Sequence, residues 1–133
     1  MALTVGVALA LAIGVLTTIA GMTRDRALYP TVTIVVGSYY ALFAAMGAST
    51  EVLVVESVVG MVFLALAITG FRTSLWIAAA ALAGHGLFDF VHGELITNPG
   101  MPVWWPPFCA AYDLTAAGFL AWLITSGRVR ATT

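Results

Sequence analysis

Five stretches of about twenty residues with almost no charge dominate this sequence and restrict how it can fold. They cover residues 2–22, 29–49, 52–71, 73–95 and 103–126. A helix needs roughly 20 apolar residues to cross the hydrocarbon core of a bilayer, and it satisfies its backbone polar groups internally. We therefore predict an all-α polytopic membrane protein: a single domain, residues 1–133, in which five transmembrane helices form a bundle.

The composition excludes several classes of protein. Hydrophobic residues make up 62% of the chain and charged residues 8%, whereas soluble domains carry about 25% charged residues. Five arginines, no lysine and a net charge of −1 leave no basic face for nucleic acid. A single cysteine excludes a disulfide framework within the chain.

The arginines predict the orientation in the membrane. They fall in three places that a five-helix chain brings to the same end, namely Arg24 and Arg26, Arg72, and Arg128 with Arg130. The positive-inside rule places that end in the cytoplasm, so the N-terminus is expected outside the cytoplasm and the C-terminus inside. The short connections further predict that consecutive helices are antiparallel neighbours.

Three carboxylates lie within the predicted spans, and they are the candidate catalytic residues. Glu56, Asp89 and Asp113 come from three different helices, yet a rise of 1.5 Å per residue places all three roughly 6 to 10 Å below the outer helix ends. A carboxylate near the bilayer centre costs from about 2.5 kcal/mol upward, so such groups normally face the bundle interior and serve a function.

Histidine and cysteine accompany these carboxylates at helical spacing. His85, Asp89 and His92 share one face at i, i+4 and i+7, and Cys109 shares a face with Asp113 at i, i+4. Imidazole and carboxylate suit zinc, iron, copper or manganese. The stripe on the fourth helix is about 10 Å long, which favours two metals, or one metal with the second histidine outside its ligand shell. The predicted divalent metal site comprises His85, Asp89, His92, Asp113, Glu56 and Cys109.

Each residue also has an ordinary structural interpretation. A buried His85 can be a hydrogen-bonded core residue, Cys109 a small hydrophobe, and Glu56 a structural hydrogen-bond partner between helices. Tyr39 and Tyr40 can simply pack, or one of them can turn its hydroxyl toward the cluster. Together, three carboxylates and two imidazoles would repel or desolvate one another unless protons or a cation balance them.

The last two predicted helices resemble those of a group of small bacterial integral membrane proteins of unknown function. The resemblance rests on an H-x-x-x-D-x-x-H helix at residues 85–92, a proline-containing loop at 98–100, and a C-x-x-x-D helix at 109–113, with Trp105-Pro106 and Tyr112 alongside. It implies a bacterial inner membrane location and a shared site of His85, Asp89, His92, Cys109 and Asp113.

Three functions remain open on sequence grounds. The first is a metal-dependent enzyme that acts on a lipid-like substrate in the outer half of the bilayer. The second is a component of ion or proton transport, and the third is an accessory subunit of a larger membrane complex. The expected partners are membrane lipid and either further copies of the chain or a larger complex, but not nucleic acid.

Overall fold

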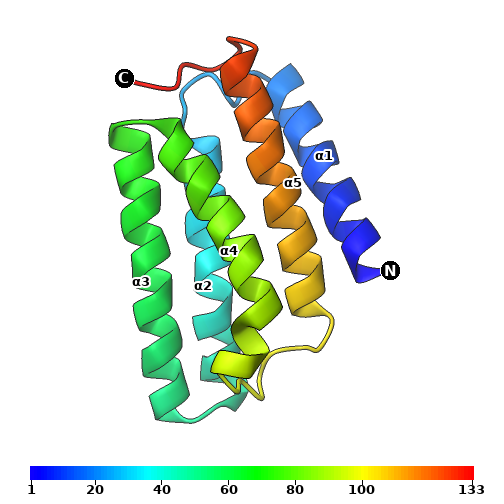
Figure 1. Ribbon diagram of the computed structural model, residues 1–133, viewed down its shortest axis with the longest axis vertical. Coiled ribbons are helices and arrows are strands. Elements are labelled where there is room, and N and C mark those ends of the chain that lie inside the picture. Colours follow the sequence, from blue (N-terminus) through cyan, green and yellow to red (C-terminus); the bar gives the residue numbers. More distant parts are fainter.

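Figure 1 shows a computed structural model that describes residues 1–133 as five helices and no strand. All five are long and apolar enough to cross a membrane, and the all-α prediction is confirmed. One isolated β-bridge joins Ser74 to Thr132. The predicted helix ends differ from the observed ones by no more than three residues. The helices are α1 (Ala2–Ile19), α2 (Leu28–Gly47), α3 (Thr50–Arg72), α4 (Leu75–Leu95) and α5 (Trp105–Thr125).

Local sequence accounts for several of the helix ends. Ser49 and Ser74 cap α3 and α4, since their hydroxyls accept hydrogen bonds from Val52 N and Trp76 N. Prolines occupy the first turn of α5, where no backbone N–H is needed. α1 ends three residues earlier than predicted because Gly21 adopts a φ of +79° that terminates the helix.

The first helix lies at the edge of the bundle and does not pack against the second. The prediction that all consecutive helices are neighbours is therefore wrong for this pair. α4 contacts α2, α3 and α5, whereas α1 contacts α5 alone and does not touch α2. The connection at residues 20–27 is long enough for the chain to pass beyond α5. Small residues at i, i+4 and i+8, Gly6, Ala10 and Gly14, are buried against α5. A Cβ at Gly6 would clash with the Phe108 carbonyl oxygen, so this close packing requires glycine.

The arginine-bearing segments meet at one end of the bundle. Arg26 donates from Nη2 to the carbonyl oxygens of Ala131 and Thr73, at 3.1 Å and 3.5 Å. The backbone N–H of Leu75 also donates to the Ala131 carbonyl oxygen, at 2.7 Å. These contacts fasten the C-terminal segment across the ends of α3 and α4, where the C-terminus appears in Figure 1.

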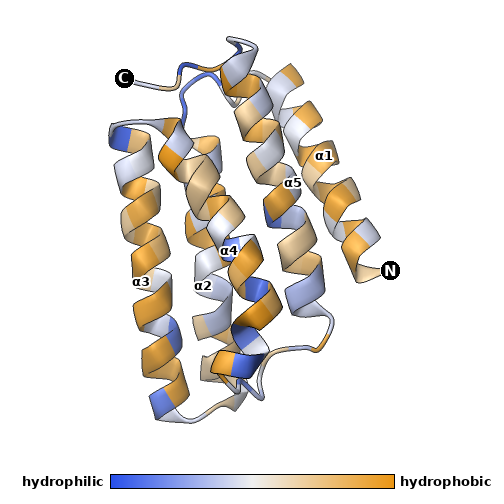
Figure 2. Cartoon of the chain, in the orientation of Figure 1, coloured by the Kyte–Doolittle hydropathy of each residue, from blue (hydrophilic) through white to orange (hydrophobic).

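The interior changes character along the bundle axis. Toward the arginine end it is apolar, with Leu75, Leu82, Leu120 and Leu123 almost fully buried. Hydrophilic residues enter the interior in the other half, on the inward faces of α4 and α5 (Figure 2). Large apolar side chains are exposed on all five helices, a surface far more apolar than that of soluble monomers.

Candidate metal centre

The six side chains predicted as ligands or catalytic groups all lie in the bundle interior, each at most 2% exposed. The structure divides them into two adjoining groups. The ligand cluster consists of His85, Asp89, Cys109 and Asp113. The outer pair consists of Glu56 and His92. The assignment of these residues as metal ligands or catalytic groups remains a prediction.

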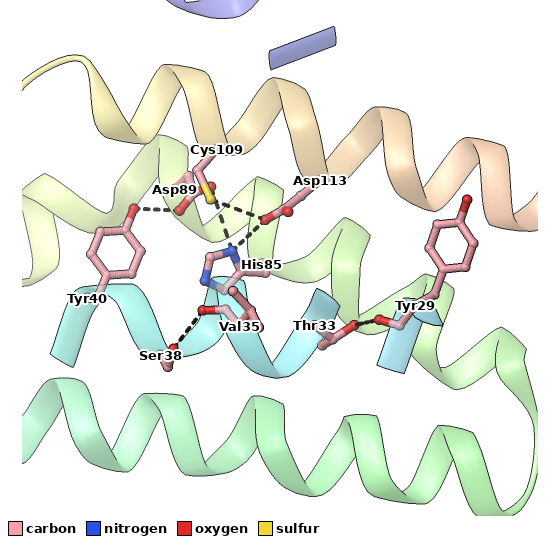
Figure 3. A network of polar contacts seen from close by, with 9 residues as sticks. All are labelled: Tyr29, Thr33, Val35, Ser38, Tyr40, His85, Asp89, Cys109 and Asp113. Atoms are coloured by element: carbon pink, nitrogen blue, oxygen red, sulfur yellow. Dashed lines mark hydrogen bonds and ion pairs between the residues drawn. The ribbon is translucent and has the colours of Figure 1, made fainter. Parts of the chain in front are cut away.

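The ligand cluster brings two helices together at close range (Figure 3). His85 Nδ1 lies 2.7 Å from Asp113 Oδ2 and 3.7 Å from Asp89 Oδ2. Cys109 donates from Sγ to Asp113 Oδ2 at 3.6 Å. One potential ligand atom from each of the four residues lies within 4.8 Å of the other three. Four potential metal-ligand atoms from α4 and α5 thus lie close together in the interior.

Two of these three separations match those between the ligands of a tetrahedral metal ion. Bonds of 2.0–2.3 Å to zinc hold the ligand atoms roughly 3.3 to 3.8 Å apart. The Cys109 to Asp113 and His85 to Asp89 separations, 3.6 Å and 3.7 Å, fall in this range. The 2.7 Å contact between His85 and Asp113 is a hydrogen bond and would lengthen by about 1 Å if both atoms bound one ion. Asp113 Oδ1 has no hydrogen-bond partner, whereas Oδ2 is held by both His85 and Cys109.

Helical spacing and small residues create this proximity. His85 and Asp89 are one turn apart on α4, and Cys109 and Asp113 are one turn apart on α5. Gly86 lies at the contact between the helices, where a Cβ would come within 3.1 Å of the Ala110 carbonyl oxygen and 3.2 Å of the Asp113 Cβ. The two pairs therefore face each other at a distance that larger residues at this crossing would prevent.

Tyr40 on α2 connects the ligand cluster to the outer pair. Its hydroxyl donates to Asp89 Oδ1 at 2.5 Å, and its ring stacks on the His92 ring with centroids 3.9 Å apart. Tyr39 does not reach the cluster and packs instead against Trp105, with centroids 4.7 Å apart. Of the two tyrosines considered from the sequence, Tyr40 is the one whose hydroxyl reaches the cluster.

Asn98 in the loop between α4 and α5 completes the outer pair. His92 Nε2 lies 2.8 Å from Glu56 Oε1. Asn98 Nδ2 donates to the same Glu56 oxygen at 2.9 Å and to the Tyr40 carbonyl oxygen at 3.0 Å. The loop is held close to α2, because Gly100 packs against the backbone of the last α2 turn. The amide thus fixes the carboxylate that holds His92.

The sequence predicts only a proline-containing loop at residues 98–100, and the contacts of Asn98 with Glu56 and Tyr40 were not predicted. Its turn function is real, since Asn98 Oδ1 accepts a hydrogen bond from Gly100 N at 3.3 Å. One signal was available: Asn98 is the only side-chain amide in the sequence, which contains no glutamine. A unique amide directly after a histidine-bearing helix is a candidate for holding that helix's partners.

Five polar atoms of the two groups are buried without a hydrogen-bond partner in the chain. Buried polar groups in proteins are nearly always paired, and each unpaired one costs about 1–3 kcal/mol. Their concentration in one place makes this part of the interior a candidate binding site. They are Glu56 Oε2, His85 Nε2, Asp89 Oδ2, His92 Nδ1 and Asp113 Oδ1.

Comparison with known proteins adds no functional assignment. No family model matches the chain, and neither a curated protein nor a solved structure shows significant similarity to it.

Proposed function

We propose that this chain is a multi-pass protein of the bacterial inner membrane that holds one divalent transition metal in the ligand cluster and uses it to act on a lipid-like substrate. The observation that carries the proposal is the convergence of four ligand atoms, all buried, within 4.8 Å of one another. The apolar surfaces of all five helices support the membrane location. The collection of arginines at one end supports a cytoplasmic position for that end.

Electrostatics supports a bound cation. The two groups contain the buried carboxyl groups of Glu56, Asp89 and Asp113 but no arginine or lysine. An isolated buried charge costs several kcal/mol unless an opposite charge compensates it. A divalent ion between His85, Asp89 and Asp113 would compensate two carboxylates at once and would provide partners for their unpaired oxygens.

The donor set indicates which kind of metal fits. Magnesium and calcium prefer oxygen ligands only. A thiol and an imidazole beside two carboxylates favour zinc, iron or another transition metal. The four residues suffice for one ion, and His92 is engaged by Glu56 at 2.8 Å instead of facing the ligand cluster. We therefore assign one metal, with His92 outside its ligand shell.

The outer pair contains a buried proton acceptor and adjoins the ligand cluster through Tyr40. Glu56 holds His92 through Nε2, which leaves Nδ1 buried and without a partner. A carboxylate that fixes one ring nitrogen of a histidine in this way prepares the other nitrogen to accept a proton. A divalent metal held by only three residues of the ligand cluster would leave one position for water and would act on it as a Lewis acid.

A transport function is less consistent with the interior of the bundle. A path for ions or protons requires polar groups across the whole membrane. The buried carboxylates and histidines lie in one half only, and the other half is filled by Leu75, Leu82, Leu120 and Leu123. The chain by itself therefore has a polar site but no continuous polar path.

Metal analysis of purified protein tests the proposal. We expect about one transition metal ion per wild-type chain by plasma mass spectrometry, and loss of at least about 90% of it in Asp89→Asn, because a neutral amide is a far weaker ligand than a carboxylate. The matched control is Glu94→Gln, which neutralises an exposed carboxylate on the same helix and should retain the metal. Metal-free wild-type protein, prepared with all candidate metals supplied and unchanged in stability when they are added, would refute the metal centre.

A further inference from the structure

One end of the bundle carries all five arginines and almost no negative charge. Asp25 is the only carboxylate side chain at this end. The ion pairs of the chain all involve histidine, so no arginine is paired with a carboxylate within the chain. The arginines are Arg24, Arg72, Arg128 and Arg130, which are exposed, and Arg26, which is partly exposed.

Contacts between distant segments bring three of these arginines to one corner of the bundle. Arg26 donates from Nη2 to the carbonyl oxygens of Thr73 and Ala131. Thr73 directly follows Arg72, and Ala131 directly follows Arg130. Three segments far apart in the sequence therefore place their arginines close to one another, where Figure 2 shows hydrophilic residues.

The C-terminal arginines lie on a segment that is built into the bundle. Val129 is only 6% exposed and belongs to the apolar core. The backbone N–H groups of Arg128 and Val129 both donate to the Leu123 carbonyl oxygen, at 2.9 Å and 3.3 Å. Arg128 and Arg130, on either side of Val129, remain exposed. Because ordering a flexible segment lowers affinity, a segment that is already ordered favours binding of an anion.

Two tryptophans place this cationic surface at the level of lipid headgroups. Arg128 Cζ lies 4.9 Å from the centroid of the Trp122 ring. Trp122, near the end of α5, and Trp76, at the start of α4, are 45% and 46% exposed. Tryptophan is enriched where a bilayer meets water. A phospholipid fits this combination better than a soluble anion, because its phosphate meets the arginines while its chains meet the apolar surface.

We propose that the arginine end of the bundle binds the headgroups of anionic phospholipids in the surrounding leaflet. The inference rests on the proposed membrane location and adds a lipid partner in the half of the bundle opposite the ligand cluster. Guanidinium groups bind phosphate oxygens bidentately. Each arginine near an anionic membrane surface strengthens association about fivefold. A zwitterionic lipid carries the same phosphate, but its choline cancels the charge.

Quenching of tryptophan fluorescence by brominated lipids tests this inference. The full chain carries Trp104→Phe and Trp105→Phe, so that only Trp76 and Trp122 at the arginine end report. It is placed in vesicles of phosphatidylcholine and phosphatidylglycerol, in which one or the other lipid has brominated acyl chains. We expect phosphatidylglycerol to bind at least about fivefold more tightly, roughly the contribution of one arginine. The unaltered chain, in which all four tryptophans contribute, should show the same preference to a smaller extent.

Salt and charge variants identify the cause of the preference. Raising the salt from about 0.1 M to about 1 M shortens the Debye length from about 10 Å to about 3 Å and should bring the preference below about twofold. The combined variant Arg72→Gln, Arg128→Gln and Arg130→Gln should have the same effect, because it removes three exposed cations. Arg26 is kept, since it holds the C-terminal segment.

The matched control replaces the same three arginines by lysine, which keeps the charge and should keep the preference. Equal binding of the two lipids by the chain with arginine would overturn the inference and leave the cationic surface for an acidic protein. A preference that persists in the glutamine variant would overturn it as well.

Metal content of the same samples separates this inference from the proposed function. A preference for phosphatidylglycerol in protein that holds no metal would support the headgroup site and refute the metal centre. Protein that holds metal but shows no preference between the two lipids would overturn the headgroup site alone.

Discussion

Asn98 gives the sharpest test of the site geometry, because one side chain contributes three hydrogen bonds. Its amide donates to Glu56 Oε1 and to the Tyr40 carbonyl oxygen, and its oxygen accepts from Gly100 N. Asn98→Ala removes all three. A side-chain hydrogen bond inside a membrane protein contributes about 0.6 kcal/mol to stability on average. Three such bonds together correspond to a loss of unfolding free energy near 2 kcal/mol. A bond to a charged acceptor contributes about 1.5–3 kcal/mol, which raises the expected loss of unfolding free energy to about 2–4 kcal/mol.

Equilibrium unfolding in mixed micelles, followed by tryptophan fluorescence and circular dichroism, measures this loss. The neighbouring substitution Thr97→Ala is the control, because Thr97 is exposed and should change stability by no more than about 0.5 kcal/mol. Asn98→Asp should be at least as damaging as Asn98→Ala, since it places a second carboxylate against Glu56. An Asn98→Ala variant as stable as Thr97→Ala would show that the loop does not hold the outer pair.

Three further predictions concern the hydroxyl contact, the packing of α1 and the metal. Tyr40→Phe should lower the free energy of unfolding by about 1–3 kcal/mol, since it leaves Asp89 Oδ1 without a hydrogen-bond partner. Tyr39→Phe is the control and should be nearly neutral. Equal losses of stability for the two variants in the same assay would contradict the contact between Tyr40 and Asp89. Gly6→Leu should detach α1 from α5, because even a Cβ at this position would clash with the α5 backbone. Gly118→Ala should leave α1 in place, because a Cβ at Gly118 would meet open space. Crosslinking between cysteines placed on α1 and α5 measures the difference. Adding zinc at 100 times its dissociation constant to chelated protein should stabilise it by about 2.7 kcal/mol, and Asp89→Asn should abolish the shift in thermal unfolding.

The helices and the buried groups followed from simple properties of the chain. Hydrophobic length determined where the five helices lie, and the pairing of Cys109 with Asp113 on one face followed from a spacing of four residues. Charge within an apolar segment then singled out Glu56, Asp89 and Asp113. These properties are local, so the sequence displays them directly.

The arrangement of the helices depended on contacts that the sequence does not display. Gly6, Ala10 and Gly14 show that one face of α1 can approach another helix closely, but they do not specify α5 instead of α2. Likewise the stripe on α4 is too long to meet one partner, and only the packing of α3 shows that Glu56 meets His92. Asn98 was missed for the same reason, since its loop folds back onto α2.

The attachment of α1 to α5 alone has a consequence for biosynthesis. The ribosome completes α1 at residue 19 and reaches the start of α5 only at residue 105, a delay of roughly 4 to 17 s at 5–20 residues per second. During that interval the glycine face of the first helix has no partner within its own chain. α1 thus emerges well before the helix on which it docks, and its docking follows the synthesis of every residue of the ligand cluster and the outer pair up to Trp105.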